Sequence, residues 1–278
     1  IIEDKYEVIN VPVLKDLDIY SMSHVDLIFE IMSTILLHFA NSSEKLANLR
    51  DDDFSQLYNY WHSEHFITTI FMDETESSIN SEVSAEGSAE LSAGTGIISK
   101  LKFLIKVATK GQGILKTSTA TRDELKTRVE PRMGDLIAAI NSAINAINQN
   151  LGVKKLLIII EDLDKADQDS IDEIFTKHFT QLSDLNVKMI FNIPISLEYS
   201  LAFKKIKDNA NANFVLSAIN VLDGKGNRND KNIQFFKKFV YKRAEDRFFD
   251  NKALEYMIVK SGGILRDLFA ILTDAAIN

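Results

Sequence analysis

Residues 156–167, LLIIIEDLDKAD, run from branched aliphatic side chains directly into a cluster of carboxylates and one lysine. An apolar run without polar alternation is typical of a central strand in a parallel sheet, because both faces of such a strand are covered. In open α/β sheets, ligands bind beyond the carboxyl ends of the strands. The carboxylates therefore fall where a ligand would bind, and a hydrated Mg²⁺ ion with its phosphate ligand could neutralise them. The alternative is that the acids begin a solvated loop and cap the next helix.

The segments around this stretch alternate between strand and helix patterns. Runs rich in β-branched or apolar residues predict strands, and apolar residues at helical spacing predict helices between them. The predicted strands are residues 6–13, 156–160, 187–193 and 214–221, and the predicted helices include 25–40, 170–185 and 197–207. A long helical stretch over 119–150, broken near Pro131, leads into the acidic strand. This alternation predicts an α/β fold with a parallel sheet covered by helices on both faces.

Composition and pattern divide the chain into regions. We expect an α/β core over residues 1–222 and a helical lid over 223–278, where helix patterns follow the turn DGKGNRND. Residues 73–116 begin with a segment rich in Ser, Ala, Glu and Gly and are interpreted as an insertion. Its second half alternates apolar residues with lysines, so it could be a strand or an amphipathic helix.

The overall composition limits the possible classes of protein. Apolar residues make up 45% of the chain and charged residues 26%, with no apolar stretch long enough to span a bilayer. The net charge of -8 argues against broad binding to a phosphate backbone, so nucleic-acid binding is expected only through other regions. The absence of cysteine excludes disulfides and thiolate metal sites. We expect a soluble cytoplasmic protein without a membrane partner.

The acidic stretch resembles the Walker B segment of P-loop NTPases. Its form EDLDK is similar to that of a branch of bacterial AAA+ and STAND-type ATPases related to the KAP and origin-recognition groups. The resemblance implies that Glu161 holds Mg²⁺, usually through water, and that Asp162 orients or activates the attacking water. Asp164 and Lys165 match the extension common in that branch. In one departure, the metal position holds a Glu where the family more often has Asp.

Two further segments fit this resemblance. Asn192 ends the strand after the acidic one and resembles sensor 1, although an Asn at a strand end is also a common turn former. In SGGILRDLF, Ser261 could cap a helix that places Arg266 near its start, where the helix dipole disfavours a cation. A cation there suggests an anionic partner, and the resemblance to sensor 2 implies contact with nucleotide phosphate. A salt bridge to a neighbouring acid is the alternative.

The phosphate-binding loop of the family has no counterpart in the chain. The pattern G-x-x-x-x-G-K-[ST] does not occur: Lys116 in GQGILKTS follows Leu, and Lys225 in DGKGN precedes Gly. The order of strands matches the family from its second strand onward. We therefore expect the first strand, which lies between the fourth and fifth in the family's sheet, and the P-loop upstream of Ile1, and we expect the lid to be truncated.

Other residues carry weaker signals. His62 and His65 are three apart in a probable helix and could share a metal ion, but no third ligand is identifiable. Two groups of arginines could supply an arginine finger to a neighbouring subunit. One lies on a single helical stretch and the other in the first lid helix. They are Arg122, Arg128 and Arg132, and Arg243 and Arg247. For both groups the alternative is a solvated helix face.

Together these patterns predict an ATP-binding and ATP-hydrolysing module with ATP and Mg²⁺ as ligands. The expected reaction is Mg-dependent attack of water on the γ-phosphate, coupled to lid movement. Self-association or fused effector domains are the expected partners. Two alternatives stay open: a nucleotide-gated switch or assembly scaffold that does not hydrolyse ATP, and an interaction domain that has lost its nucleotide site.

Overall fold

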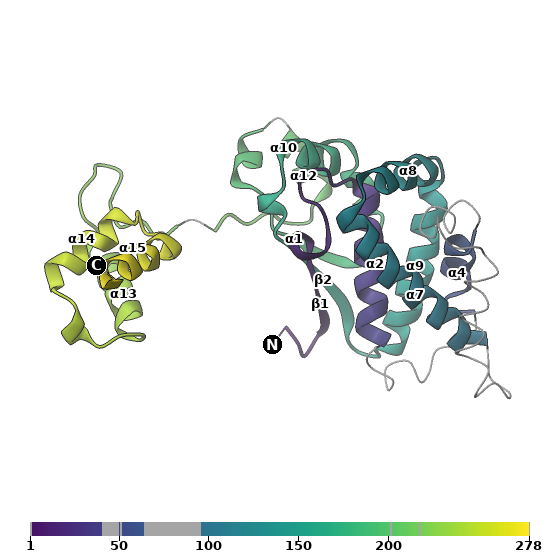
Figure 1. Ribbon diagram of the computed structural model, residues 1–278, viewed down its shortest axis with the longest axis horizontal. Helices are drawn as coiled ribbons and strands as arrows, with labels where there is room; N and C mark the ends of the chain where they lie inside the picture. The colour runs from purple at the N-terminus through teal and green to yellow at the C-terminus, as the bar shows by residue number, and fades with distance from the viewer. Residues whose placement is uncertain are drawn as a thin grey trace. The chain divides into compact units, whose positions relative to one another are not determined.

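The computed structural model describes residues 2–40, 50, 52–63, 96–200, 202–216 and 218–277 of the 278-residue chain. The chain divides into two compact units, Ile1–Asn213 and Phe214–Asn278, and each has its own cluster of buried apolar side chains. The first unit is mostly helical around a small three-stranded parallel sheet (Figure 1). The predicted α/β class with a parallel sheet is confirmed.

The sheet has the order β1-β2-β3, with β1 at Tyr6–Pro12, β2 at Lys155–Glu161 and β3 at Lys188–Phe191. Both neighbouring pairs are parallel. Leu156, Ile158 and Ile160 of β2 are at most 1% exposed, and Leu157 on the opposite face is also buried. The acidic stretch therefore does follow a central strand that is covered on both faces, as its apolar sequence predicts.

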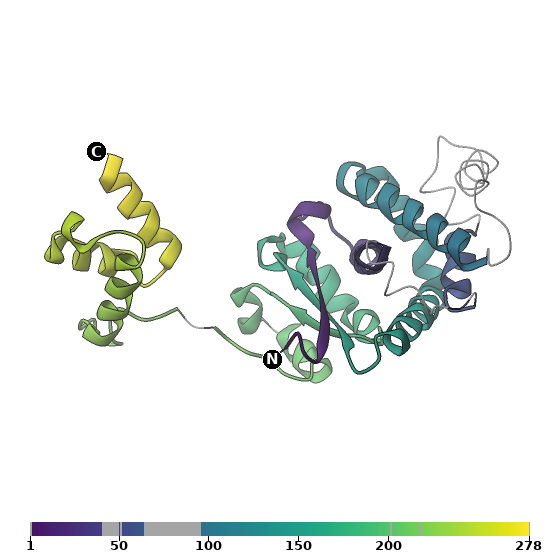
Figure 2. The same ribbon diagram turned by 90° about the horizontal axis from the view of Figure 1, so that it is seen from below.

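Helix α2 (His24–Ala40) packs on β1 and lies between the sheet and helix α7 (Gly96–Thr117), as Figures 1 and 2 show. The second half of the expected insertion over 73–116 forms helix α7, so the amphipathic helix and not the strand is found there. Phe103 and Leu104 of α7 are buried in the main apolar cluster. Among the lysines between these apolar residues, Lys102 is exposed and Lys106 is half-buried, which fits an amphipathic helix. Residues 73–95 lie outside the described residues.

The stretch over 119–150 forms α8 (Thr119–Val129) and α9 (Met133–Asn150), joined by a short 3₁₀ turn that contains Pro131. This confirms the predicted break. The remaining elements of the first unit are α1 (Val13–Asp16), α4 (Ser55–Trp61), η2 (Leu163–Lys165), α10 (Gln168–Ile171), η3 (Asp172–Lys177), α11 (Phe179–Ser183), η4 (Ile195–Tyr199) and α12 (Ala202–Asn209).

The second unit is helical. Its elements are α13 (Asp230–Tyr241), η5 (Asp246–Phe248), α14 (Asn251–Lys260) and α15 (Leu265–Ile277). The strand predicted at 214–221 is wrong: the described residues of that segment form no ladder, and Phe214 and Leu216 are 89% and 98% exposed. A β-rich sequence becomes a strand only where a neighbouring strand edge accepts its backbone hydrogen bonds.

None of the helices in the described ranges combines the length and the apolar character needed to cross a bilayer.

Candidate functional site

The acids of the EDLDK stretch lie at the carboxyl end of β2. Asp162 has φ 69° and ψ 7°, and it is the only residue other than glycine with a positive φ among the described residues. This left-handed turn ends the strand at Glu161 and lets Leu163 return to the core, where it is fully buried. The side chains of Glu161 and Asp164 stay exposed at the sheet edge. The expected position of the acids, beyond the strand end, is confirmed.

Asn192 lies beside these acids. Its backbone N–H donates to the Ile160 carbonyl at 3.1 Å, and its side-chain Nδ2 donates to Asp164 Oδ1 at 3.1 Å. Lys165 pairs with Asp162 across the same turn. Parallel strands bring their carboxyl ends to one edge, which is why residues far apart in the sequence meet here. The structure thus brings together the predicted strand-end group of Asp162, Asp164 and Asn192.

The strand-end group offers a divalent cation one or two carboxylates rather than a complete set of protein ligands. Glu161, Asp162 and Asp164 do not gather their oxygens into a group of three, since the one such group among the described residues lies elsewhere. Mg²⁺ commonly binds through one or two carboxylates, several waters and a substrate phosphate. The residues present therefore fit a Mg-phosphate ligand and do not form a cage for a bare ion.

Arg266 belongs to the second unit. It is the second residue of α15 and is exposed, and it has no hydrogen-bond or ion-pair partner within the described chain. The predicted cap is wrong: Ser261 ends α14, with its hydroxyl donating to the Ile258 carbonyl. The turn into α15 uses Gly263 at φ +83°, where a Cβ atom would lie 2.0 Å from the Ile219 carbonyl oxygen. Glycine is therefore required for this approach.

Arg122, one of the arginine-finger candidates, is buried in the first unit. It is 3% exposed, and its guanidinium donates to the Leu115 carbonyl at 2.6 Å and to Asp18 at 3.0 Å. A buried guanidinium whose two terminal nitrogens both donate hydrogen bonds has a structural role. The arginine finger and the solvated helix face are therefore both wrong for this residue. Arg128 pairs with Glu124 on the same helix.

The other candidates from the sequence are packing or surface residues. The guanidinium of Arg243 lies over the Phe239 and Phe269 rings, and Arg247 pairs with Glu245. His62 stacks on the Tyr58 ring, with ring centroids 5.2 Å apart, and His65 lies outside the described residues. His62 is therefore explained by packing.

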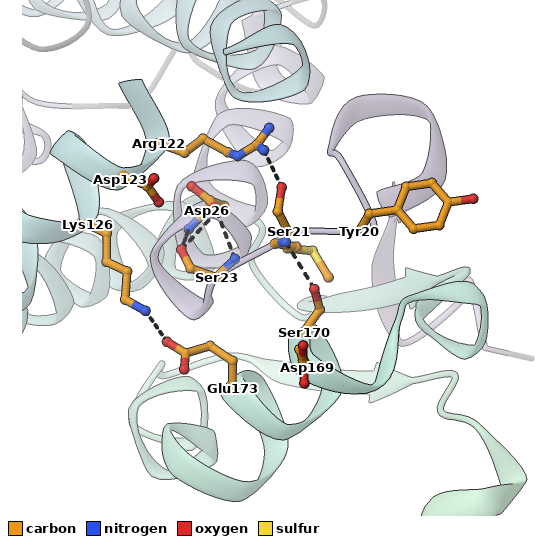
Figure 3. Close-up of a pocket in the computed structure, with 11 residues that line it drawn as sticks. Tyr20, Ser21, Ser23, Asp26, Arg122, Asp123, Lys126, Asp169, Ser170 and Glu173 are labelled. Atoms are coloured by element: carbon orange, nitrogen blue, oxygen red, sulfur yellow. Dashed lines mark hydrogen bonds and ion pairs between the residues drawn. The ribbon is translucent and has the colours of Figure 1, made fainter. Parts of the chain in front are cut away.

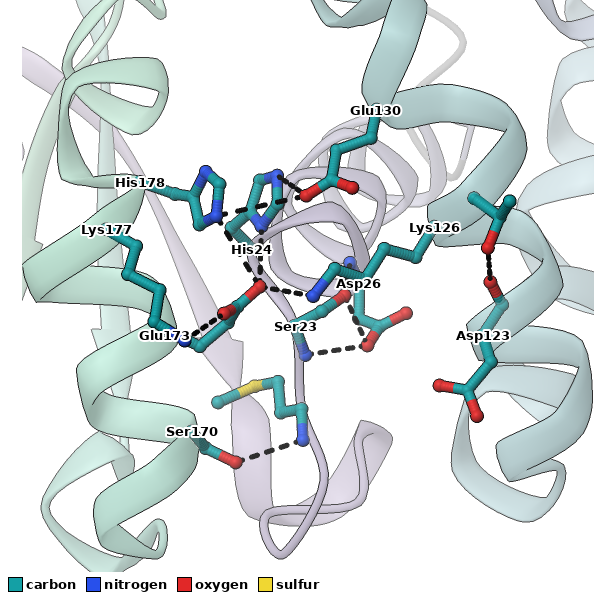
Figure 4. A network of polar contacts seen from close by, with 12 residues as sticks. Ser23, His24, Asp26, Asp123, Lys126, Glu130, Ser170, Glu173, Lys177 and His178 are labelled. Carbon is teal, nitrogen blue, oxygen red and sulfur yellow. Dashed lines mark hydrogen bonds and ion pairs between the residues drawn. The ribbon is translucent and has the colours of Figure 1, made fainter.

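A second polar group lies at the start of α2 and was not expected from the sequence. His24, Glu130, Glu173 and His178 each offer one ligand atom, and these atoms all lie within 4.8 Å of one another (Figure 4). No other such group occurs in the part of the chain that the structure describes. We call these four residues the His/Glu centre. They come from α2, the turn between α8 and α9, and the helical segment after β2.

The helical segment after β2 contains an uncommon form of helix. The predicted single helix over 170–185 is wrong in detail, because residues Asp172–Lys177 form a π-helix between α10 and α11. Asp167 caps α10 by accepting a hydrogen bond from the Ser170 N–H at 2.9 Å. For this acid, the alternative that the carboxylates after the strand cap the next helix is therefore correct. The π-helix contains Glu173, and His178 follows it directly.

His24 is fully buried, and neither of its ring nitrogens has a hydrogen-bond partner. Its ring stacks on that of His178, with centroids 3.7 Å apart and planes 9° apart. Burial, together with the nearby positive groups His178 and Lys126, lowers the pKa of His24 to about 4 despite the opposing effect of Glu173. The imidazole is therefore neutral near pH 7, which is the form that binds metals.

Glu173 is the anion of the centre. Burial alone would raise the pKa of its carboxyl, but hydrogen bonds from Lys126 and Lys177 lower it to about 2. Its Oε1 atom lies 3.4 Å from His24 Nδ1 and 3.6 Å from His178 Nε2. Glu173 is therefore ionised and lies between the two imidazoles and the two lysines (Figure 4).

A polar pocket of about 180 Å³ opens beside the centre (Figure 3). Ser23 and Asp26 at the start of α2 line it, together with Lys126 and Glu173. Ser23 caps α2, with its N–H and hydroxyl both donating to Asp26 at 2.8 Å. Ser170 joins the segments after β1 and β2 by accepting from the Met22 N–H at 3.1 Å. The pocket thus lies on the side of the sheet where ligands bind in open α/β folds.

No protein-family model, curated protein or solved structure was found to match this chain.

Proposed function

We propose that the chain forms the core of a Mg-ATP-binding ATPase of the AAA+/STAND type, with the nucleotide phosphates at the carboxyl edge of the sheet. The observation that carries the proposal is Asp162, an acid held in a left-handed backbone at the end of the central buried strand. A residue other than glycine in this conformation costs about 1–2 kcal/mol. Such strain concentrates at functional sites.

The neighbouring residues support the same site. Asn192 reaches the same edge from β3 and contacts Asp164. The edge of β3 away from β2 is unpaired within the described residues, and this is where the resemblance expects a further strand. Arg266 is an exposed cation without a partner in the described chain and is free to bind an anion.

Each residue then has a defined role. Glu161 holds the hydrated Mg²⁺, which neutralises phosphate charge when bound. Asp162 accepts a hydrogen bond from the attacking water and orients it toward the γ-phosphate. Asn192 donates to the γ-phosphate or to the same water, and Arg266 contacts phosphate from the lid. Positioning and charge neutralisation are the main contributions a protein makes to this reaction.

The deciding experiment is calorimetric titration of Mg-ATP into the full natural polypeptide. We expect saturable binding at micromolar concentration or below that weakens in Arg266→Ala and persists in Asp162→Asn, because Arg266 holds phosphate and Asp162 acts on water. Arg247→Ala, another exposed arginine of the second unit, is the matched control and should bind like the parent protein. Absence of binding in a folded protein would refute the proposal and leave an interaction domain.

Rates of hydrolysis separate the working ATPase from the switch. Turnover that accompanies binding supports an enzyme. Tight binding with negligible turnover would support a nucleotide-gated switch or scaffold that uses the same site.

A further inference from the structure

We propose that the His/Glu centre is a binding site for a first-row transition-metal dication, with Zn²⁺ as the ion that its ligands suit best. The four side chains supply two imidazole nitrogens and two carboxylate oxygens. Zn²⁺ accepts this mixed set in a four-coordinate arrangement, whereas Mg²⁺ and Ca²⁺ prefer oxygen ligands alone. The site is separate from the strand-end group that is proposed to hold Mg-ATP.

Two of the distances between ligand atoms match this chemistry, and all four atoms lie within 4.8 Å of one another. Four ligands at about 2.0–2.1 Å from a tetrahedral Zn²⁺ ion stand roughly 3.3–3.5 Å from one another. Glu173 Oε1 is 3.4 Å from His24 Nδ1 and 3.6 Å from His178 Nε2, and Glu130 Oε1 is 3.9 Å from the same His178 atom. Small movements of side chains would bring these atoms to the separations found around a bound ion.

The buried histidine requires an explanation that packing does not provide. His24 is 0% exposed and both of its nitrogens lack a hydrogen-bond partner. An imidazole buried without partners loses its hydrogen bonds to water and gains none in return, at a cost that folded proteins usually avoid. A metal ion would satisfy one nitrogen directly. The unpartnered nitrogens therefore point to a ligand that completes the site.

The π-helix is a second, independent indication. Residues five apart differ by about 140° around an α-helix, so Glu173 and His178 would lie on different faces of one. In a π-helix the hydrogen bonds join residues five apart, and Asp172–Lys177 has this form. It brings the Glu173 and His178 side chains to the same side, facing His24 (Figure 4). Short π-helical turns are uncommon and occur frequently at functional sites.

Lys126 occupies part of this site in the structure. Its ammonium group pairs with Glu173 and is the obvious alternative partner for the buried carboxylate. The Lys126 side chain is 31% exposed and lines the open pocket, so it has room to turn away. A dication would replace its charge next to Glu173. The stacked His178 ring, 21% exposed, would tilt so that its lone pair meets that of His24 at the ion.

The competing explanation is a static ion pair between Lys126 and Glu173 with the two stacked histidines beside it. That arrangement neutralises Glu173 and leaves the nitrogens of His24 unsatisfied. It predicts no specific affinity for metal ions. The two explanations therefore differ in a measurable way.

The test is calorimetric titration of ZnCl₂ into the full chain after dialysis against a chelator and then against chelator-free buffer. A parallel sample receives Co²⁺, whose absorption bands report coordination geometry. We expect one Zn²⁺ ion per chain, binding at micromolar concentration or below, unaffected by millimolar Mg²⁺, and tetrahedral Co²⁺ bands.

His178→Ala and Glu173→Gln are the test variants, because both side chains lie at the edge of the core and circular dichroism can check that each variant folds. Each should weaken Zn²⁺ binding by at least about tenfold and remove the Co²⁺ bands. His38→Ala is the control: it removes a partly exposed histidine that pairs with Glu7 elsewhere on α2, and it should leave both signals unchanged. Absence of saturable binding to the parent chain, or equal binding by the folded His178→Ala variant, would overturn the proposal.

Discussion

At the end of β2, Glu161 and Asp164 are exposed, and the neighbouring polar side chains satisfy one another through the Asn192 and Lys165 contacts. At the start of α2, by contrast, His24 is fully buried and its nitrogens make no hydrogen bond, although Glu173 Oε1 lies 3.4 Å from Nδ1. The first group consists of solvated polar side chains beside an apolar strand. The second combines one fully buried imidazole with two half-buried side chains, Glu173 and His178, and the exposed Glu130.

The difference shows how each group would select its ligand. Exposed carboxylates attract a hydrated cation with its phosphate and keep most of the ion's water. The buried His24 imidazole has already lost its water, so a metal ion that replaces it meets a ligand that is largely in place. The sheet edge would therefore bind a transient ligand, whereas the His/Glu centre would hold its ion persistently. The following predictions test this comparison.

The largest effect is expected at Asp162. Replacing it with Asn in the full natural polypeptide should lower ATP turnover by at least about 100-fold, because an amide cannot accept the proton of the attacking water. Asp162→Gly should lose turnover equally but raise the free energy of unfolding by up to about 1 kcal/mol, since glycine adopts a positive φ without strain. Asp184→Asn, an exposed acid away from the sheet edge, is the control. Unchanged turnover in Asp162→Asn would remove the catalytic role.

The next effect concerns Glu30, a fully buried acid of α2 that accepts from Thr34 at 2.8 Å and Gln112 at 2.6 Å. Burial raises its pKa from 4.5 to about 7. The folded protein therefore keeps a proton between these values that the unfolded chain releases. The free energy of unfolding should fall as pH rises from about 4.5 to above 7.

Glu30→Gln should remove this dependence. As pH rises from 4.5 to 8, the free energy of unfolding of the variant should increase by on the order of 1–3 kcal/mol relative to that of the parent chain. Denaturant unfolding at several pH values measures the difference, with Glu198→Gln as a control. Parallel curves for parent and variant would show that Glu30 is not a proton-binding group in the folded state.

A smaller effect is expected at Lys126. Lys126→Met removes the cation that competes with a metal ion for Glu173, so Zn²⁺ affinity should rise by about tenfold, equivalent to about 1.4 kcal/mol. The metal-free protein should lose about 1 kcal/mol of stability, because a partly buried carboxylate loses its partner. Competition with a zinc indicator and thermal unfolding measure the two effects.

Lys177→Met is the matched control for this prediction. Lys177 is 62% exposed and donates to the other oxygen of Glu173 at 3.2 Å. Its removal should therefore change the Zn²⁺ affinity and the stability of the metal-free protein less than Lys126→Met does. An unchanged Zn²⁺ affinity in Lys126→Met would indicate that the ion does not bind at Glu173.

The smallest effect is expected for the stability of the second unit. Arg266→Ala should change the free energy of unfolding by less than about 0.5 kcal/mol, because this exposed arginine makes no contact that the substitution would remove. Lys237→Met in the same unit should destabilise it more, since Lys237 is buried and donates to Glu255 at 2.7 Å. A large loss of stability in Arg266→Ala would assign this residue a structural role instead of phosphate binding.

The strand-end group was predictable because its signals are local. The run LLIII identifies a strand covered on both faces, and the acids and Asn192 follow strand ends directly in the sequence. Parallel strands must bring these positions to one edge. The helical stretch over 119–150 and its break near Pro131 were predictable for the same reason, since helical period and proline act on neighbouring residues.

The His/Glu centre depends on information that a single sequence pattern does not contain. His24, Glu130 and Glu173 are far apart in the chain, and only the packing of α2 against the segment after β2 places Glu173 beside the buried His24. Glu173 and His178 are out of phase for an α-helix, so their spacing predicts separation. The burial of Arg122 and the inclusion of α7 in the core are decided in the same way.

The sequence by itself therefore determined the class of the fold, the central strand and the position of the acids at its carboxyl end. Tertiary structure decided which polar groups lose their water, because burial depends on contacts between distant segments. It also decided the π-helical phase that places Glu173 beside His178. Local backbone preferences depend on neighbouring residues in the sequence, whereas the desolvation of a side chain depends on the packing of the whole molecule.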